Sequence, residues 1–313
     1  MNLQQLEYIV ALDTHKNFSK AAEVCFITQA TLSTMVKKLE EELEIMIFDR
    51  KTSPIITTES GQKIIVEAKK IVHQINQLKQ ISSEIKNTIE GELKIGVIPT
   101  IASNLLHRIL PDLIKTYPLL KLDIYEITTN NIIQKLKNGE IDAAILSTPL
   151  KHNEFLKKVL YYENLFVYGN IKEIKNRKYI TTKEINNETV WLLEQGNCLT
   201  DQIINVCNLK EKELNKNIRF KPNTLETLVN MVDNFNGLTL IPELFYKDLS
   251  DARKSNVIDF IKPSPVREIS LVYYYPYSKL KLIEAVEQFI KDKITPIIEI
   301  KEYDPLLYRI AEL

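Results

Sequence analysis

Two of the three cysteines, Cys198 and Cys207, lie nine positions apart in one short segment, so reversible thiol–disulfide chemistry is the first reaction to consider. The residues between them predict a helix, because apolar side chains recur there near helical spacing, at Leu199, Ile203, Ile204 and Val206. We expect this helix to begin near Asn197 or Thr200, either of which could cap its first turn.

A helix between the two cysteines would hold their thiols apart. An α-helix rises about 1.5 Å per residue, so nine steps separate the two Cα atoms by roughly 13 Å. A disulfide needs its Cα atoms within about 7 Å of each other. Formation of a Cys198–Cys207 bond would therefore require the helix to unwind, which is a redox-driven conformational change within one segment.

The two cysteines differ in their predicted surroundings. Cys198 follows Gly196 and Asn197 at the start of the helix, where backbone N–H groups and the helix dipole favour a thiolate. Cys207 follows an apolar helix and is expected to be more buried. A reactive thiol beside a hidden resolving thiol is typical of a redox sensor. The alternative remains open at this point, because free cysteine is among the most buried residue types and most such pairs are inert core.

The composition of the chain sets limits on its class. A length of 313 residues predicts two or three domains, and the zero net charge provides no global attraction to nucleic acid or membrane. We find neither an N-terminal signal pattern nor an apolar run that could span a bilayer, and we expect a cytoplasmic protein without structural disulfides. The four histidines do not have metal-ligand spacing with a cysteine, so we expect no metal site and no cofactor.

Residues 1–58 predict short helices joined by tight turns, with the spacing of a helix-turn-helix followed by a β wing at 55–58. Ser19 is the predicted N-cap of the second helix, and the third helix is predicted over 30–43. This third helix would bury Leu32, Val36 and Leu39. Its predicted outward residues, together with Arg50 before the wing, form the candidate DNA-binding set: Thr28, Gln29, Thr31, Ser33, Thr34, Lys37, Lys38 and Arg50.

The chemistry of that set suits DNA, because glutamine can read adenine edges while Ser, Thr and Lys reach bases or phosphates. The alternative is a small helical bundle with no role on DNA. Local net charge does not exclude it, since four glutamates between Glu40 and Glu44 nearly cancel the lysines. The signs are segregated, however, and the charge of the face matters more than the net charge.

Residues 59–90 predict one long helix ended by Gly91. Its apolar stripe alternates steps of three and four residues, through Ile64, Ala68, Ile71, Ile75, Leu78 and Ile85. Such a narrow stripe is typical of a coiled-coil seam and therefore of a dimer. The alternative is a helix packed on its own domain.

Residues 91–295 predict an α/β domain with a parallel sheet and helices on both faces. Strands are predicted at 93–98, 120–127, 141–146, 190–193, 238–241 and 269–275. Helices are predicted at 101–117, 131–137, 198–207, 225–235 and 280–291. Residues 296–313 would form a tail that either packs on a neighbour through Leu306, Leu307 and Ile310 or frays.

The N-terminal motifs resemble the winged helix-turn-helix of LysR-type transcriptional regulators. The segments that carry this likeness are Phe18–Ala22, Thr28–Ser33, Lys38–Leu43, Ile47–Arg50 and Thr58–Gly61. The resemblance implies that Thr28–Ser33 begins the recognition helix and that Arg50 is the arginine of the wing. Thr34 stands where an arginine is common in the family. The resemblance also implies dimerisation through the 59–90 helix, a homotetramer, contact with promoter DNA and RNA polymerase, and a two-lobed effector domain resembling periplasmic binding proteins.

Further segments resemble the hydrogen-peroxide-sensing OxyR branch of that family: Trp191–Gln202 with Cys207, Thr224–Val232, Ile98–Thr100, Arg267 and Cys25. The resemblance implies that Cys198 is the peroxide-reactive thiol and Cys207 its resolving partner. Residues that could hold peroxide and its proton are Thr100, Thr129, Asn197, Thr200, Asp201 and Arg267. Asn197 stands where histidine is common, and its amide can donate a hydrogen bond but cannot carry a proton at neutral pH.

These observations together predict a cytoplasmic transcriptional activator, and not an enzyme, that senses hydrogen peroxide through a reversible Cys198–Cys207 disulfide. One alternative is a LysR-type regulator gated by a small molecule in the cleft between the lobes, with non-redox cysteines. A thiol peroxidase is a second alternative, and the DNA-binding motif argues against it.

Overall fold

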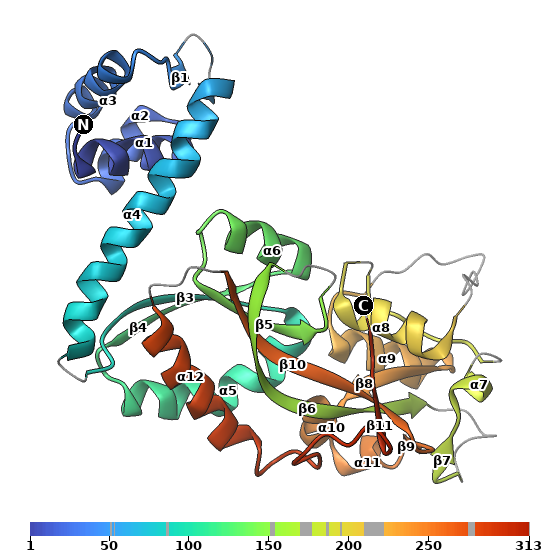
Figure 1. Ribbon diagram of the computed structural model, residues 1–313. Helices are drawn as coiled ribbons and strands as arrows, with labels where there is room; N and C mark the ends of the chain where they lie inside the picture. Colours follow the sequence, from blue (N-terminus) through green and yellow to red (C-terminus); the bar gives the residue numbers. More distant parts are fainter. Residues whose placement is uncertain are drawn as a thin grey trace. The chain divides into compact units, whose positions relative to one another are not determined.

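The computed structural model describes residues 1–50, 52, 54–85, 88–150, 154–169, 177–185, 188–194, 196–209, 222–274 and 279–312, without the side chains at 73 and 76–85 (Figure 1). Contacts divide the chain into two units, Met1–Thr88 and Ile89–Leu313. Lys51, Gln195, Tyr275 and the side chains of Leu78 and Ile85, which belong to predicted segments, lie outside the described residues.

The first unit contains helices α1 (Leu3–His15), α2 (Phe18–Val24) and α3 (Gln29–Leu43), and the two-stranded sheet β1 (Phe48–Asp49) and β2 (Ile56–Thr57). The prediction that Ser19 caps α2 is wrong, because the Asn17 side chain accepts the Lys20 N–H at 3.0 Å. Helix α3 begins one residue earlier than predicted, at Gln29, since the Thr28 hydroxyl accepts the Thr31 N–H at 3.2 Å.

The core of the first unit confirms the predicted inner face of α3. Leu32, Val36 and Leu39 are fully buried, and they pack with Ile9 and Leu12 of α1. The opposite face of α3 is left to solvent, because its hydrophobic residues repeat along one side only.

Helix α4 (Glu59–Ile85) is shorter than the predicted 59–90 helix. Gly91 does not end it; this residue opens strand β3 with φ +137°, a backbone conformation that favours glycine. Part of the predicted stripe packs within the first unit, since Ala68 is buried and Ile64 contacts the same core, while Ile71 is exposed. Dimerisation through the remainder of α4 stays a prediction.

The second unit is built on a mixed sheet with the strand order β4-β3-β5-β10-β6-β9-β7, where β11 pairs with β10 and β8 with β6. The strands are β3 (Gly91–Val97), β4 (Leu120–Glu126), β5 (Ala143–Thr148), β6 (Phe155–Gly169), β7 (Tyr179–Ile180), β8 (Leu238–Pro242), β9 (Val257–Phe260), β10 (Ser264–Tyr274) and β11 (Tyr308–Ile310). The α/β class and the parallel pairing of β3, β4 and β5 confirm the prediction.

The prediction of a wholly parallel sheet is wrong at its centre, where β10 runs antiparallel to both β5 and β6. Strand β6, which no sequence pattern predicted, follows β5 after a connection of residues 149–154. That connection is too short for the crossover that a parallel pair needs. The predicted strand at 190–193 is also wrong, because Val190 makes only an isolated bridge to Leu238 and the chain then turns toward α8.

The helices of this unit are α5 (Pro99–Thr116), α6 (Thr129–Lys137), α7 (Thr182–Ile185), α8 (Cys198–Cys207), α9 (Leu225–Phe235), α10 (Glu243–Asp248), α11 (Asp251–Lys254) and α12 (Leu280–Ile294). No helix among the described residues has both the length and the apolar content that crossing a bilayer requires.

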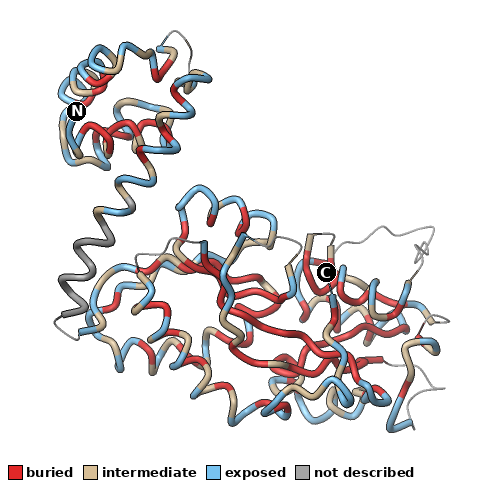
Figure 2. Tube along the Cα trace, viewed as in Figure 1, coloured by how far each residue is buried: buried red, intermediate tan, exposed pale blue. Residues whose placement is uncertain are grey.

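The second unit has two hydrophobic cores, and β6 and β10 run between them (Figure 1). Tyr161 of β6 belongs to the first core and Tyr168 of the same strand to the second. Burial is concentrated along these central strands (Figure 2). Helix α8 joins the same two lobes, because Cys198 packs in the first core and Cys207 in the second.

The prediction that residues 296–313 form a tail that frays or packs on a neighbour is wrong. Strand β11 pairs in parallel with β10 of the same chain. Ala311, which is fully buried, donates its N–H to the Val266 carbonyl at 2.8 Å, and its own carbonyl accepts the Gln202 amide at 2.7 Å. The segment after α12 is therefore part of the second lobe and contacts α8.

Candidate functional site

The two cysteines are the first and last residues of α8. Asn197 occupies the N-cap position, but its side chain does not bond the first turn. Gly196 has φ +97°, which only glycine adopts readily, and it turns the chain into the helix. Asn208, with φ 50°, ends the helix in the left-handed conformation common after a C-terminus.

The Cys198 thiol is buried and hydrogen-bonds the hydroxyl of Thr129, the first residue of α6. Two helix N-termini therefore meet at this sulfur, one from α8 and one from α6. Helix N-termini carry partial positive charge and free N–H groups, so the position suits an anion.

Burial works against the thiolate at the same position. Desolvation raises the pKa of Cys198 above its ordinary value, while the Thr129 hydrogen bond and the charge of Arg267 pull it back, and the charge of Asp201 raises it further. The predicted stabilisation of the thiolate is thus present but outweighed in this closed arrangement. Asp201 was predicted to help hold peroxide and its proton, but its negative charge raises the pKa of Cys198 and so disfavours the thiolate.

Arg267 is the centre of the polar cluster beside Cys198, and it is fully buried. Its guanidinium donates to the Glu163 carboxylate at 3.0 Å, to the Thr100 hydroxyl at 3.2 Å and to the Gln202 side-chain oxygen at 3.2 Å. Sheet register sets the first contact, since Arg267 of β10 and Glu163 of β6 are antiparallel partners.

Glu163 balances the arginine only in part. Desolvation raises the pKa of Glu163 to about 7, although Arg267 opposes the shift, so burial dominates over the ion pair. Arg267 contributes a guanidinium cation with several N–H donors to the cluster. The cluster therefore holds a cation near the thiol in a site closed to solvent.

Sequence reasoning missed Gln202, which links the cluster to the C-terminal segment. It is fully buried and donates to the Ser147 hydroxyl at 2.9 Å and to the Ala311 carbonyl at 2.7 Å. Its position four residues after Cys198 places it on the same helix face, which was a usable signal. Glu163 was also missed, although an acid within the apolar run of β6 indicates a buried partner.

Three of the six predicted peroxide-binding residues lie in the cluster around Cys198: Thr100, Thr129 and Arg267. The other three use their polar groups elsewhere or face solvent. The Asn197 amide donates to the Glu194 carbonyl at 3.0 Å and the Thr200 hydroxyl to the Leu193 carbonyl at 3.0 Å. Asp201 is exposed.

Among the described residues, Cys207 packs in the second hydrophobic core. Desolvation alone raises its pKa to about 12. Its side chain is 1% exposed and that of Cys198 is 4% exposed, so Cys207 is the more buried of the two, as predicted, but by a small margin. Among the described residues, the larger difference is that a cation and a hydroxyl oppose the effect of burial on the pKa of Cys198.

The predicted DNA-binding residues lie on the open face of the first unit. Thr28, Gln29, Thr31, Thr34, Lys37 and Lys38 are exposed, and Ser33 is half-buried. The Thr34 hydroxyl donates a hydrogen bond to the Ala30 carbonyl at 2.8 Å. Arg50 pairs with Glu40 at 2.6 Å and lies 5.4 Å over the Phe18 ring, so its side chain is held at the base of the wing.

Comparison with known protein families covers both units. Residues 3–62 match the model of the bacterial regulatory helix-turn-helix protein of the lysR family. Residues 86–295 match the LysR substrate binding domain.

Individual proteins are similar over most of the chain. The hydrogen peroxide-inducible genes activator of Pectobacterium carotovorum subsp. carotovorum is 33% identical over 87% of this chain and 90% of its own length. The DNA-binding transcriptional dual regulator OxyR of Escherichia coli K12 is 33% identical over 87% of this chain and 89% of its own. A full-length OxyR variant from Pseudomonas aeruginosa is 30% identical, with a TM-score of 0.77 over 93% of this chain and 98% of that one.

Proposed function

The chain belongs to the LysR family of transcriptional regulators and is of the OxyR type, and on that basis we propose that it senses hydrogen peroxide through a reversible Cys198–Cys207 disulfide and controls transcription accordingly. Its family is one of transcription regulators, not of enzymes. We further propose that it works in the cytoplasm, as a homotetramer of dimers joined through α4, on promoter DNA and with RNA polymerase.

The observation that carries the proposal is the pairing of Cys198 with Thr129 next to buried Arg267. A thiol that reduces peroxide must react as its anion and needs donors for both peroxide oxygens. Thr129 adjoins the sulfur, and Arg267 with Thr100 adds further donors. Cys207 has no such neighbours among the described residues, which suits a partner that reacts second.

In the first step the Cys198 thiolate attacks one oxygen of hydrogen peroxide. The S–O bond forms as the O–O bond breaks, sulfur loses two electrons, and the leaving hydroxide takes a proton to become water. A cation and a hydroxyl aimed at this region would stabilise the charge that develops on the leaving oxygen.

In the second step Cys207 attacks the sulfenic sulfur of Cys198. The S–S bond forms, the S–O bond breaks, and a second hydroxide leaves as water after protonation. Because the two cysteines are the first and last residues of a ten-residue helix, their Cα atoms are roughly 13 Å apart along it and must come within about 7 Å to bond. Helix α8 therefore unwinds, and Cys207 leaves the second core.

Unwinding of α8 would alter both lobes, since the helix contributes to both cores. We propose that this changes how the effector domains pack in the oligomer and thus the spacing of the DNA-binding faces on the promoter. Asn197, Thr200 and Asp201 would contact peroxide only after the α8 entry rearranges, because their polar groups are committed elsewhere or face solvent in the reduced state.

Counting thiols tests the proposal. The full-length reduced protein is treated with one equivalent of peroxide, blocked with an alkylating agent and weighed intact. Loss of two alkylation sites, mapped to a peptide pair joining Cys198 and Cys207, is the expected result. The Cys25→Ser variant is the matched control and should lose the same two sites. Three thiols still free would refute the proposal and favour a LysR-type regulator gated by a small molecule between its lobes.

A further inference from the structure

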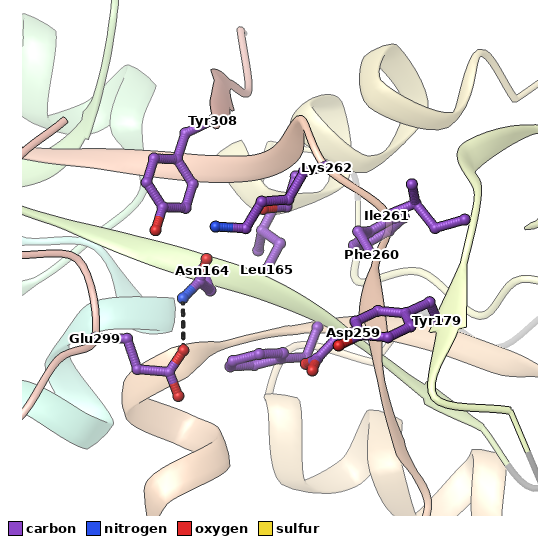
Figure 3. Close-up of a pocket in the computed structure, with 11 residues that line it drawn as sticks. Asn164, Leu165, Tyr179, Asp259, Phe260, Ile261, Lys262, Glu299 and Tyr308 are labelled. Atoms are coloured by element: carbon purple, nitrogen blue, oxygen red, sulfur yellow. Dashed lines mark hydrogen bonds between the residues drawn. The ribbon is translucent and has the colours of Figure 1, made fainter. Parts of the chain in front are cut away.

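A cavity of about 410 Å³ lies in the second lobe, and neither Cys198 nor Cys207 lines it (Figure 3). Its size is within the range of small-molecule sites. Strands β6 and β9 and the C-terminal segment supply most of its wall. The lining residues are Asn164, Leu165, Phe166, Tyr179, Asp259, Phe260, Ile261, Lys262, Ser264, Glu299 and Tyr308.

The cavity shares no lining residue with the redox cluster. Asn164 lines the cavity, whereas the side chain of Glu163, the preceding residue of the same strand, binds Arg267. Glu299 and Tyr308 come from beyond residue 295, where the match to the LysR substrate binding domain ends. The cavity is thus formed in part by a segment outside the family domain.

Charges of opposite sign line different parts of the cavity. Lys262 extends toward Tyr308, with its ammonium 4.9 Å from the ring centre, while Glu299 and Asp259 lie apart from it on the other side (Figure 3). Lys262 forms no ion pair among the described residues. Glu299 is already engaged, since its carboxylate accepts the Asn164 amide at 3.1 Å and lies 3.7 Å from the Lys247 ammonium (Figure 3). The Lys262 ammonium and the Asp259 carboxylate are therefore the groups available at separated positions across the cavity.

Two polar side chains of the wall, Ser264 and Asp259, accept or donate no hydrogen bond among the described residues. Ser264 is buried, with 8% exposure, and its hydroxyl makes no hydrogen bond within the described chain. The Asp259 carboxylate accepts no hydrogen bond from any described residue. Desolvation by the walls, followed by the charge of Glu299, raises the pKa of Asp259, so a cation bound there would relieve both effects. Phe166, Phe260 and Tyr179 provide aromatic surface between these groups.

We propose that this cavity binds a small zwitterion of dipeptide size, with its ammonium between Asp259 and Glu299, its carboxylate at Lys262 and an apolar side chain against the aromatic wall. The charged groups remain exposed at the cavity mouth, so the affinity expected is weak, in the millimolar range. The bound molecule would hold the C-terminal segment, which contributes Glu299 and Tyr308, against β6 and β9.

Three probes of matched size test the site on the reduced full-length protein by titration calorimetry: glycyl-L-phenylalanine, its N-acetyl derivative and its C-terminal amide. We expect saturable binding of the zwitterion, and about tenfold weaker binding when either charged end is removed, because each end forms a charge-assisted contact. Absence of saturable binding by the zwitterion at millimolar concentration would overturn the proposal. Equal binding by all three probes would do so too.

Variants locate the binding in the cavity. Asp259→Asn keeps the shape of the side chain and should weaken the zwitterion about tenfold, and Lys262→Met should do the same. Glu302→Gln, an exposed acid of the same C-terminal segment that does not line the cavity, is the matched control and should bind as the parent protein does. Unchanged binding in both cavity variants would place the ligand elsewhere and refute the assignment.

Discussion

The two ends of helix α8 provide two environments for the same chemical group. Both thiols are almost completely buried, and both have raised pKa values. At the first end, Thr129 and Arg267 oppose the effect of burial on Cys198. At the second end no described residue opposes it, and the pKa of Cys207 rises to about 12.

The difference teaches that exposure would not distinguish these thiols in the mechanism that we propose. Neighbouring donors and charge would do so, because they decide how unfavourable a thiolate is in a site closed to water. In that proposal the sulfur with polar neighbours reacts first, and the other sulfur reacts only after its core opens.

Substitution of each cysteine gives the largest expected effect. Cys198→Ser should abolish the reaction with one equivalent of peroxide, whereas Cys207→Ser should keep the rate of the first step and stop at the sulfenic acid. Stopped-flow mixing with peroxide, followed by dimedone labelling and mass spectrometry, measures both. If Cys207→Ser lost the first step as fully as Cys198→Ser, the proposed division of roles between the two ends would be wrong.

Removal of the buried cation should have the next largest effect. Arg267→Met leaves Glu163 buried without its partner, so we expect the free energy of unfolding to fall by about 3–5 kcal/mol. The double variant Arg267→Met/Glu163→Gln removes both charges and should recover much of that loss, while its peroxide reaction stays at least about tenfold slower than the parent's. Urea unfolding and peroxide kinetics separate the two effects. A double variant with parental kinetics would exclude Arg267 from the chemistry.

The hydroxyl beside the sulfur can be removed without changing the shape of the site. Thr129→Val should slow the first step about tenfold, because one donor to the reacting group is lost. Thr128→Val is the matched control: its side chain makes no capping bond, and it precedes the same helix. Peroxide kinetics should show no change for the control. Equal slowing in both variants would mean that the effect comes from packing of α6.

The smallest expected effect is the pH dependence of stability that arises from Cys207. Its folded pKa, about 12, lies above the ordinary 9.0, so the unfolded thiol ionises first and stability is lost as pH rises. Between about pH 8 and 9.5 the contribution is roughly 0.8 kcal/mol by this linkage. Over that pH range, the free energy of unfolding measured in urea should fall by about 0.8 kcal/mol more for the parent than for Cys207→Ala. Parallel pH profiles would show that Cys207 is not buried as described.

Local pattern was enough to predict most elements of the fold. The helical spacing at 198–207 and 225–235 and the β segments at 93–98 and 238–241 correspond to α8, α9, β3 and β8. The family likeness predicted the two-lobed α/β class. The antiparallel pairing of β10 with β5 and β6 could not be predicted in this way, because it depends on which distant strands meet.

The candidate site was predictable only where motif position carried information. Four predicted residues come from four separate elements: Cys198, Thr129, Thr100 and Arg267. They could be grouped from the sequence only because of the likeness to the OxyR branch. Glu163 and Gln202 were missed because their roles come from the register of β6 on β10 and from the burial of one helix face. The predicted difference in burial between the thiols is small, since both ends of α8 enter a hydrophobic core.

The contact between Gln202 and Ala311 also has a consequence for synthesis on the ribosome. The two residues are 109 positions apart, so at about 5–20 residues per second the second follows the first by roughly 5–20 s. Throughout that interval one donor of the Gln202 amide lacks its final acceptor, and the helix that carries both thiols is not sealed. A nascent chain thus completes the contacts of α8 only after the C-terminal segment has been made, later than residues 1–88 are made.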